Sequence, residues 1–283
     1  MSTVQEFDEA TTTQLLKGID IPPQPQILRV VMEEQRRPNP DLRKIATIVA
    51  KDVGLSAAML RAANSPGFGL RQKVTSISQA VMLLGMGNAL SLITGLSLRM
   101  VMAGKGKMKL ERFWDTASDT ALLCSTLARR FSIMPADQAH ILGLFHDCGI
   151  PLLMQKFPNY VEVLRKGNAD TQLPVTSVEE QEFKTSHTVV GYLVARSWFL
   201  SQEIREVILH HHNETLLSSS DDPVLASRVA LLTLAEHITH IFHRESNDVV
   251  WQRIGSNVLR ILNLNETELE DINSDMKDVL SAE

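Results

Sequence analysis

The chain has 283 residues, 44% of them apolar and 22% charged, which is typical of a folded globular protein and excludes a mainly disordered one. Its 28 basic and 33 acidic side chains give a net charge of −5, which argues against charge-driven binding to DNA, RNA or an anionic membrane. Two cysteines, Cys124 and Cys148, cannot form a disulfide scaffold, so we expect reduced, buried thiols.

The N-terminal part of the chain reads as a short lead followed by a set of helices. Residues 1–20 are polar and acidic and lack the apolar core of a signal peptide, so we expect a cytoplasmic protein. The proline-rich segment Ile21–Pro25 cannot lie inside a helix and marks the start of the folded part. Asp41 is a good N-cap. Helical patterns follow at about 27–32, 42–49, 55–63, 77–84 and 88–102.

One uncharged stretch is long enough to resemble a membrane span. Residues 74–98 carry no charged side chain, and a span needs about 20 mostly apolar residues. The stretch contains several serines, threonines and an asparagine, and Gly85 and Gly87 interrupt it. We therefore predict two buried helices joined by a tight turn, and no membrane segment.

The C-terminal part begins after a junction predicted at Gly104–Lys107, where glycine and lysine alternate. Asp222 and Pro223 suit the start of a later helix. The acidic outer face of 265–280 indicates a solvated surface or a docking surface for a basic partner.

No alternating strand pattern occurs, so an all-α fold is predicted, with a lead (1–20), an N-terminal helical lobe (21–106) and a C-terminal lobe (107–283). Helical patterns in this part lie at about 110–131, 135–147, 158–167, 177–199 and 201–212.

The histidines gather in the second half of the chain and suggest a metal site. His146 and Asp147 are adjacent near a predicted helix end, and a nitrogen and an oxygen donor together suit zinc, manganese, iron or magnesium. Two ligands do not make a site, so others are needed. Stacked helices could bring together, as a metal or phosphate pocket, the side chains of His146, Asp147, His187, His211, His212 and Glu236.

Structural roles are open for each of these residues. His146 and Asp147 could form a buried hydrogen-bonded pair, His187 could be a core residue, and histidines at 210–212 suit a helix C-terminus. The candidates for a binding groove are Asn64, Ser65, Thr116 and Trp198. For them the alternatives are a backbone turn for Asn64 and Ser65, a core position for Thr116, and a core anchor for Trp198.

Several motifs in this order resemble a known family. The motifs follow one another along the chain in this order: the proline-rich start, Asn64-Ser65, Ile77-Ser78-Gln79-Ala80 with Leu84-Gly85, the segment 143–149, and His187 with Gly191 and Trp198. Together they are similar to the HDOD domains, relatives of the HD-type metal-dependent phosphohydrolases, over about residues 20–275. The resemblance implies a multi-helical fold with an HD-like C-terminal lobe and a regulatory role in bacterial signalling.

The resemblance also implies a metal site that departs from the active enzymes. Those enzymes use a first histidine, a His-Asp pair and a later aspartate as ligands. Here the first position matches Thr116, with Asp115 one residue away, and the later one matches Glu236. Ile150 and Pro151 follow Gly149 where many hydrolases carry a basic residue, and no Gly-Tyr-Pro signature follows His212-Asn213. These departures favour binding over hydrolysis.

The sequence thus leads to two functional hypotheses. The first is a signalling protein that binds other signalling proteins or a nucleotide-like ligand, with self-association also open, and that keeps a degenerate metal site. The second is a divergent phosphohydrolase that acts on a phosphate ester or nucleotide and uses a divalent metal. We expect no DNA partner and no membrane partner under either hypothesis.

Overall fold

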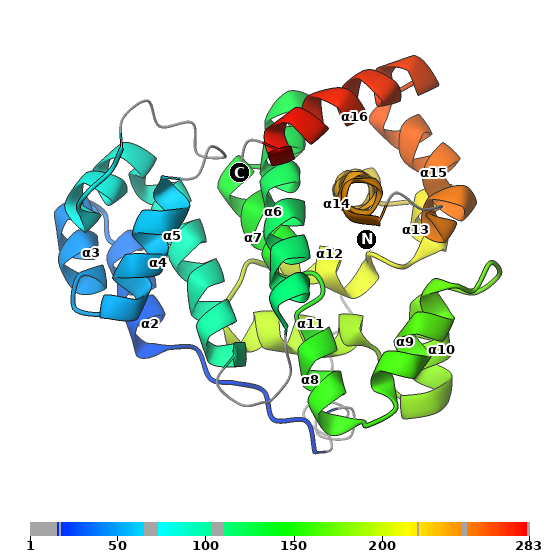
Figure 1. Ribbon diagram of the computed structural model, residues 1–283, viewed down its shortest axis with the longest axis horizontal. Helices are drawn as coiled ribbons and strands as arrows, with labels where there is room; N and C mark the ends of the chain where they lie inside the picture. The colour runs from blue at the N-terminus through cyan, green and yellow to red at the C-terminus, as the bar shows by residue number, and fades with distance from the viewer. Residues whose placement is uncertain are drawn as a thin grey trace. The chain divides into compact units, whose positions relative to one another are not determined.

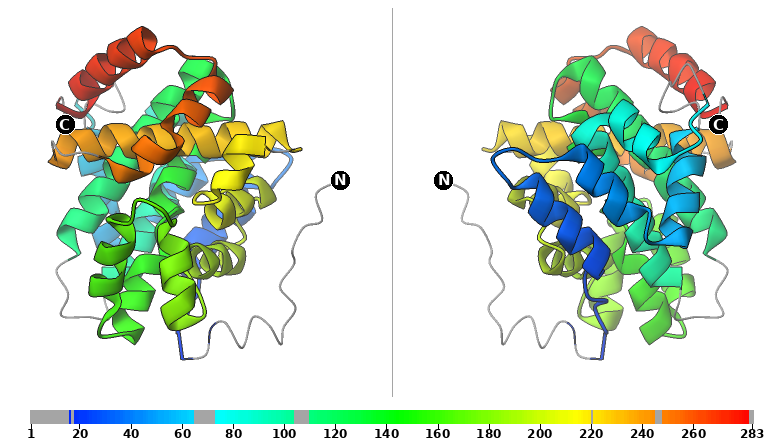
Figure 2. Two further views of the ribbon diagram at one scale, coloured as in Figure 1. Left: turned by 90° about the vertical axis from the view of Figure 1, so that its right-hand side faces the viewer. Right: turned by 90° about the vertical axis from the view of Figure 1, so that its left-hand side faces the viewer.

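The structure, a computed structural model, is built from α-helices (Figure 1). In the part of the chain that it describes no strand occurs, and the two side views agree (Figure 2). The all-α prediction is therefore confirmed. Ser65 and the predicted junction at Gly104–Lys107 lie outside the described residues, which are 16, 18–64, 73–103, 110–219, 221–244 and 248–281.

The chain divides into two compact units. Unit 1 comprises Met1–Pro22 with Lys109–Ser274, and unit 2 comprises Pro23–Met108 with Asp275–Glu283. The domain limits expected from the sequence stay a prediction. All the candidate metal ligands belong to unit 1, so the chemistry can be followed within that unit alone.

Unit 2 contains four helices before α16, and two of them begin at an aspartate cap. Asp41 accepts a hydrogen bond from the amide of Arg43 at 2.8 Å, and Asp52 accepts one from Leu55 at 2.9 Å. Both aspartates thereby satisfy amides that have no partner inside the helix. The helices are α2 (Gln26–Gln35), α3 (Leu42–Val49), α4 (Val53–Ala63) and α5 (Ile77–Ala103), with α2, α3 and α4 all packed on α5.

The apolar helix α5 is interrupted where the sequence predicts a turn. Gly85 has φ 72° and ψ 178°, a conformation that favours glycine, and it divides the helix into two segments. By length and composition alone the stretch Ile77–Met102 could cross a membrane, with a mean hydropathy of 1.7. Since 61% of its most apolar window is buried inside the protein, the stretch also has the character of a core helix.

Asn64 joins the end of α4 to Val74. Its amide nitrogen donates to the carbonyls of Leu60 and Val74 at 2.8 and 2.9 Å, and its side-chain oxygen accepts from the amide of Val74 at 2.7 Å. Both hydrogen-bonding groups of the side chain are therefore used on the backbone. This arrangement matches the backbone-turn role considered for Asn64.

Unit 1 is organised around a helical hairpin. Helix α6 (Glu111–Phe131) packs along α7 (Ala136–Phe145), and α14 (Pro223–Arg244) crosses α6 (Figures 1 and 2). Gly143 allows the close approach within the hairpin, because a Cβ there would lie 2.5 Å from the Cα of Ala121. The remaining helices of this unit are α8 (Gly149–Lys156), α9 (Tyr160–Asn168), α10 (Val175–Phe183), α11 (His187–Ser197), α12 (Gln202–His210), α13 (Glu214–Ser219) and α15 (Val249–Leu262); α16 (Glu266–Ser281) runs across the limit between the units.

Two of the predicted helices are wrong in their limits. The helix expected over 177–199 is two helices, because Lys184 adopts φ 61° and ends α10 before α11 begins. The helix expected over 135–147 ends at Phe145, where a turn leads into α8. Both breaks lie beside candidate ligands, and they let His146 and His187 occupy helix ends.

Trp198 is a core residue of unit 1. Its side chain is completely buried, and its indole nitrogen donates to the carbonyl of Pro22 at 2.9 Å. Its ring meets Phe145 edge-on with 5.6 Å between centroids. Trp198 therefore anchors the proline-rich start of the chain and does not line an open groove. Cys124 and Cys148 are free and buried, as the sequence predicts.

We expect Phe199→Gly to stabilise unit 1 by about 1 kcal/mol, since an L-residue pays roughly that much for a left-handed conformation. Phe199 has φ 58° at the end of α11, while its side chain is 66% exposed and has little packing to lose. Urea unfolding measures the change in the free energy of unfolding. Phe199→Ala is the control, because it removes the ring but keeps the strained Cβ; equal stabilisation by both variants would contradict the explanation.

Candidate metal centre

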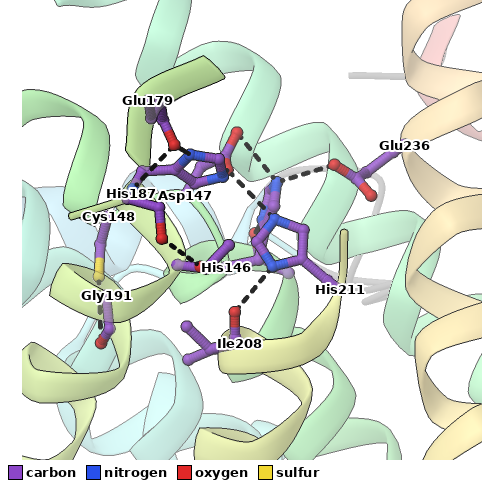
Figure 3. A network of polar contacts seen from close by, with 12 residues as sticks. His146, Asp147, Cys148, Glu179, His187, Gly191, Ile208, His211 and Glu236 are labelled. Atoms are coloured by element: carbon purple, nitrogen blue, oxygen red, sulfur yellow. Dashed lines mark hydrogen bonds and ion pairs between the residues drawn. The ribbon is translucent and has the colours of Figure 1, made fainter. Parts of the chain in front are cut away.

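The structure brings the candidate ligands together from four parts of unit 1. His146 and Asp147 lie in the turn between α7 and α8, and His187 is the first residue of α11. His211 and His212 follow the end of α12. Glu236 projects from α14 toward His146 (Figure 3). The helix breaks described above make this possible, because a residue at a helix end can face a neighbouring helix end.

Asp147 is the centre of the cluster. Its carboxylate Oδ1 lies 3.3 Å from Nε2 of His187 and 3.5 Å from Nε2 of His211. Nε2 of His146 lies 3.4 Å from Oδ2 of Asp147 and 3.4 Å from Oε1 of Glu236. A tetrahedral metal with ligand bonds of about 2.1 Å keeps its donor atoms about 3.4 Å apart. These separations therefore fit the edges of a coordination polyhedron and are long for hydrogen bonds.

The other nitrogen of three imidazoles is fixed by the protein. Nδ1 of His146 lies 2.7 Å from the carbonyl oxygen of Gly143, and Nδ1 of His211 lies 2.8 Å from that of Ile208. Nδ1 of His187 lies 2.7 Å from Oε2 of Glu179. A carbonyl or carboxylate can only accept, so each Nδ1 carries its proton and each Nε2 is directed at the carboxylates. Metal-ligating histidines are usually held in this way.

Glu179 is the functional residue that sequence reasoning missed. It is completely buried on α10, where its Oε2 also accepts from the backbone amide of His187 at 3.1 Å. Its Oε1 accepts a hydrogen bond from the hydroxyl of Tyr160 on α9. Glu179 sits in a run of several glutamates in 179–182, and nothing in that run singles it out.

Three buried donor atoms of the cluster lack a hydrogen-bond partner, as the ligands of a metal ion would. Oδ1 of Asp147, Nε2 of His187 and Nε2 of His211 are buried and have no hydrogen-bond partner. Such atoms are costly to bury alone, and a cation between them would remove that cost. Two groups of donors, each with one atom per residue within 4.8 Å of the others, share Asp147: Asp147, His187, His211 and His212; and His146, Asp147 and Glu236.

Charge coupling is strong inside the cluster. Burial acts to lower the pKa of His146, but the carboxylates of Asp147 and Glu236 outweigh it and raise this pKa well above its usual value. Burial acts to raise the pKa of Asp147, and the facing imidazoles, His146 first, hold it well below its usual value. Burial and the neighbouring His211 lower the pKa of His212 well below the usual value. His212 is thus a neutral donor, the form that metals bind.

A cavity of about 200 Å³ adjoins the cluster. Its lining includes an aromatic pair: the rings of His237 and Trp251 are stacked with 3.9 Å between centroids, and Nδ1 of His237 lies 2.9 Å from Oδ2 of Asp248. Threonine side chains of α6 and α14 also line the cavity. The cluster contributes His146, Asp147, His187, His212 and Glu236 to the lining, and the threonines include Thr116, Thr120 and Thr233.

The structure gives the groove candidates of the sequence different environments. Thr116 is exposed and lines the cavity, whereas Asp115, also exposed, is not among the lining residues. Trp198 lies in the core of unit 1, and Asn64 belongs to unit 2. Sequence reasoning also missed three histidines of the cavity wall, His237, His240 and His243, although they recur at helical spacing on α14.

Known proteins place the chain in a family. An uncharacterized protein of Treponema pallidum (strain Nichols) is 25% identical over 229 residues, 77% of this chain and 44% of that relative, so the chain spans less than half of the relative's length. A crystal structure from Shewanella amazonensis SB2B, named provisionally as a phosphohydrolase, has a TM-score of 0.73 at 19% identity, covering 95% of this chain and 96% of the other.

A second structure is an HDOD domain protein of unknown function from Geobacter sulfurreducens. It has a TM-score of 0.66 at 21% identity, covering 95% of this chain and 96% of the other. At these identities both structures show a shared fold. The family profile described as "HDOD domain" matches residues 21–214, which is more than half of the sequence. The chain belongs to the HDOD domain family.

Proposed function

We propose that this HDOD protein acts by binding: it holds a divalent metal ion at the cluster and a phosphate-bearing, nucleotide-like ligand in the adjoining cavity. The observation that carries the proposal is the set of unpartnered buried atoms on Asp147, His187 and His211. Their mutual distances of 3.3 and 3.5 Å suit a shared cation. A histidine-rich set with carboxylates suits iron, manganese or zinc better than magnesium.

The cavity lining suits a ligand that carries both an anionic group and an aromatic ring. A metal at Asp147 would supply a Lewis acid that attracts and polarises phosphate oxygens. The hydroxyl group of Thr116, which lines the cavity, can donate a hydrogen bond to such an oxygen. The stacked rings of His237 and Trp251 also line the cavity and offer an apolar, aromatic surface for a base or a similar ring.

Hydrolysis of a phosphate ester is the second candidate, and one feature favours it. The group of His146, Asp147 and Glu236 supplies three donors beside the cavity. Three protein ligands are typical of catalytic centres, where a further position is left for water, while four are typical of structural ones. Thr116 lies where the resemblance implies a further histidine, and a hydroxyl there is a poorer metal ligand.

The regulatory role is the broader part of the proposal. The HDOD resemblance implies an output to other signalling proteins, and the net charge of −5 favours protein partners over nucleic acid. Self-association is an alternative way to transmit the bound state. Binding of the metal and the ligand would be the input in either case.

Metal analysis of the purified protein is the first test. We expect about one or two equivalents of iron, manganese or zinc, lost in His211→Ala and kept in His210→Ala. His210 is a matched control, because it is the neighbouring histidine, belongs to neither donor group and lies 3.6 Å from Glu206. A wild-type protein that neither contains nor titrates any of these metals would overturn both candidate functions.

A second measurement separates binding from hydrolysis. We expect the metal-loaded protein to bind a nucleotide in calorimetric titration, and the protein stripped by a chelator not to bind it. Incubation with a phosphomonoester and with a cyclic dinucleotide is expected to release no product. Turnover that is lost in His146→Ala would favour the hydrolase, and absence of both binding and turnover would exclude a ligand of this class.

A further inference from the structure

We propose that Glu179 is a positioning residue for the metal centre: it directs Nε2 of His187 at Asp147 and places a buried negative charge behind that ligand, while Tyr160 holds Glu179. The inference rests on the proposed metal binding. It assigns a role to a residue that lies outside both donor groups. It concerns how strongly this chain's own histidine can donate to a metal.

The contacts of Glu179 are complete without a metal. Its side chain is 0% exposed, and Oε2 accepts from both the backbone amide and Nδ1 of His187, at 3.1 and 2.7 Å. Oε1 accepts from Tyr160, whose ring is also fully buried. The residues come from three consecutive helices, α9, α10 and α11. The chain Tyr160–Glu179–His187 therefore fixes the imidazole from behind.

A purely structural role leaves the charge of Glu179 unexplained. The carboxylate does replace the missing helix cap of α11, since it accepts from the first amide of that helix. Ser186 at the N-cap makes no capping bond, and its hydroxyl group lies 2.9 Å from that of Thr188. A neutral serine, asparagine or glutamine could satisfy that amide as well. Burying a carboxylate costs several kcal/mol in solvation. Its negative charge is useful where it increases the basicity of His187.

His187 differs in this respect from the two other anchored ligands. His146 and His211 donate their Nδ1 protons to neutral backbone carbonyls. Only His187, among the anchored histidines of the described cluster, faces a carboxylate with its Nδ1. A carboxylate behind an imidazole raises its basicity and orients the ring. The carboxylate behind His187 therefore makes its Nε2 a stronger donor than a neutral carbonyl in the same place would.

Glu179→Gln isolates the charge from the shape. A glutamine oxygen can accept the same two bonds from His187, and its amide group can donate to the Tyr160 oxygen. Loss of an outer partner of this kind weakens metal binding by about 10–100-fold. With Co²⁺ as the probe, we expect the Kd of Glu179→Gln to rise about 10-fold and the visible absorption of the bound cobalt to shift. Melting of the metal-free protein is expected to stay close to that of the wild type.

Two further variants keep the test decisive. Tyr160→Phe leaves the charge but releases the carboxylate, so we expect a smaller loss of Co²⁺ affinity even if Glu179→Gln should not fold. Glu180→Gln is the matched control, since this adjacent, exposed carboxylate belongs to neither donor group, and it should bind Co²⁺ like the wild type.

The outcomes separate this inference from the proposed function. Wild-type affinity and an unchanged cobalt spectrum in both Glu179→Gln and Tyr160→Phe would overturn the role of Glu179 while leaving the metal centre in place. A wild-type protein that binds no Co²⁺ would overturn the metal centre itself. Weakened binding with a shifted spectrum in Glu179→Gln, but not in Glu180→Gln, would support the inference.

Discussion

Replacing Asp147 with asparagine is expected to weaken metal binding by about 100-fold or more, since the loss of an outer partner alone costs 10–100-fold. Asp147 is the residue that both donor groups share. Its two oxygens face the Nε2 atoms of His146, His187 and His211 at 3.3 to 3.5 Å. Asparagine keeps the volume of the side chain and removes the charge, so the loss reports on coordination rather than on packing.

A second aspartate on the same cavity provides the comparison. Asp248 lines the cavity wall, contacts His237 at 2.9 Å and caps α15 through the amide of Trp251 at 3.1 Å. Asparagine caps helices as well as aspartate does, so Asp248→Asn should retain full metal content. Calorimetric titration with Mn²⁺ or Zn²⁺ measures both variants. Equal loss in the two, or wild-type affinity in Asp147→Asn, would show that Asp147 is not the shared ligand.

The two donor groups can be told apart by the same titration. Apart from Asp147 they have no residue in common. Glu236→Gln should therefore weaken the site built on His146 and Glu236 and spare the one built on His211 and His212, while His212→Ala should do the reverse. A protein that binds a single equivalent, lost to the same degree in both variants, would indicate one site that draws on both groups.

The sequence predicts where several helices begin, because the signal there is a local one. Asp41 caps α3, and Asp222 accepts from the amide of Leu225 at 2.9 Å before α14 starts at Pro223. A short polar side chain reaches only its own next amides. Such a start can therefore be recognised without knowing what the helix packs against.

Helix ends near the site were harder to predict. Lys184 ends α10 in a left-handed conformation at a position where glycine or asparagine is usual, so no residue type announced the break. The turn at 146–148 likewise carries an apolar pattern on both sides. α8, α13 and α15 were missed altogether. In each case packing in the tertiary structure decides the boundary, and periodicity alone does not contain that information.

The candidate ligands could be chosen from the sequence because metals require particular donor atoms. Histidines and carboxylates are few enough in this chain that their order restricts the choice, and the resemblance restricts it further. Glu179 has no such signature, since its role comes from lying eight residues before His187 across a helix break. The groove candidate Trp198 shows the reverse error, because an aromatic residue serves a core as well as it serves a pocket.

Gly149→Ala is expected to destabilise unit 1 by about 3 kcal/mol or more and to abolish metal binding, because overpacking against backbone cannot be relieved by a rotamer change. Gly149 begins α8 two residues after Asp147. A Cβ there would lie 2.1 Å from the carbonyl oxygen of His187 and 3.0 Å from the amide nitrogen of Gly191. The methyl group therefore requires α8 and α11 to separate.

That separation would act directly on the cluster, since α8 follows Asp147 and α11 begins with His187, whose Nε2 lies 3.3 Å from Oδ1 of Asp147. Gly85→Ala is the informative comparison. At φ 72° and ψ 178° it has no heavy atom within 4 Å of the added Cβ, so it should cost only the strain of a backbone conformation that is essentially restricted to glycine, about 1 to 3 kcal/mol. Gly85→Ala should also leave metal binding intact. Urea unfolding and metal titration of both variants distinguish the effect of the contact from that of backbone strain. If Gly149→Ala is no less stable than Gly85→Ala and still binds metal, the contact between α8 and α11 does not hold Asp147 and His187 together.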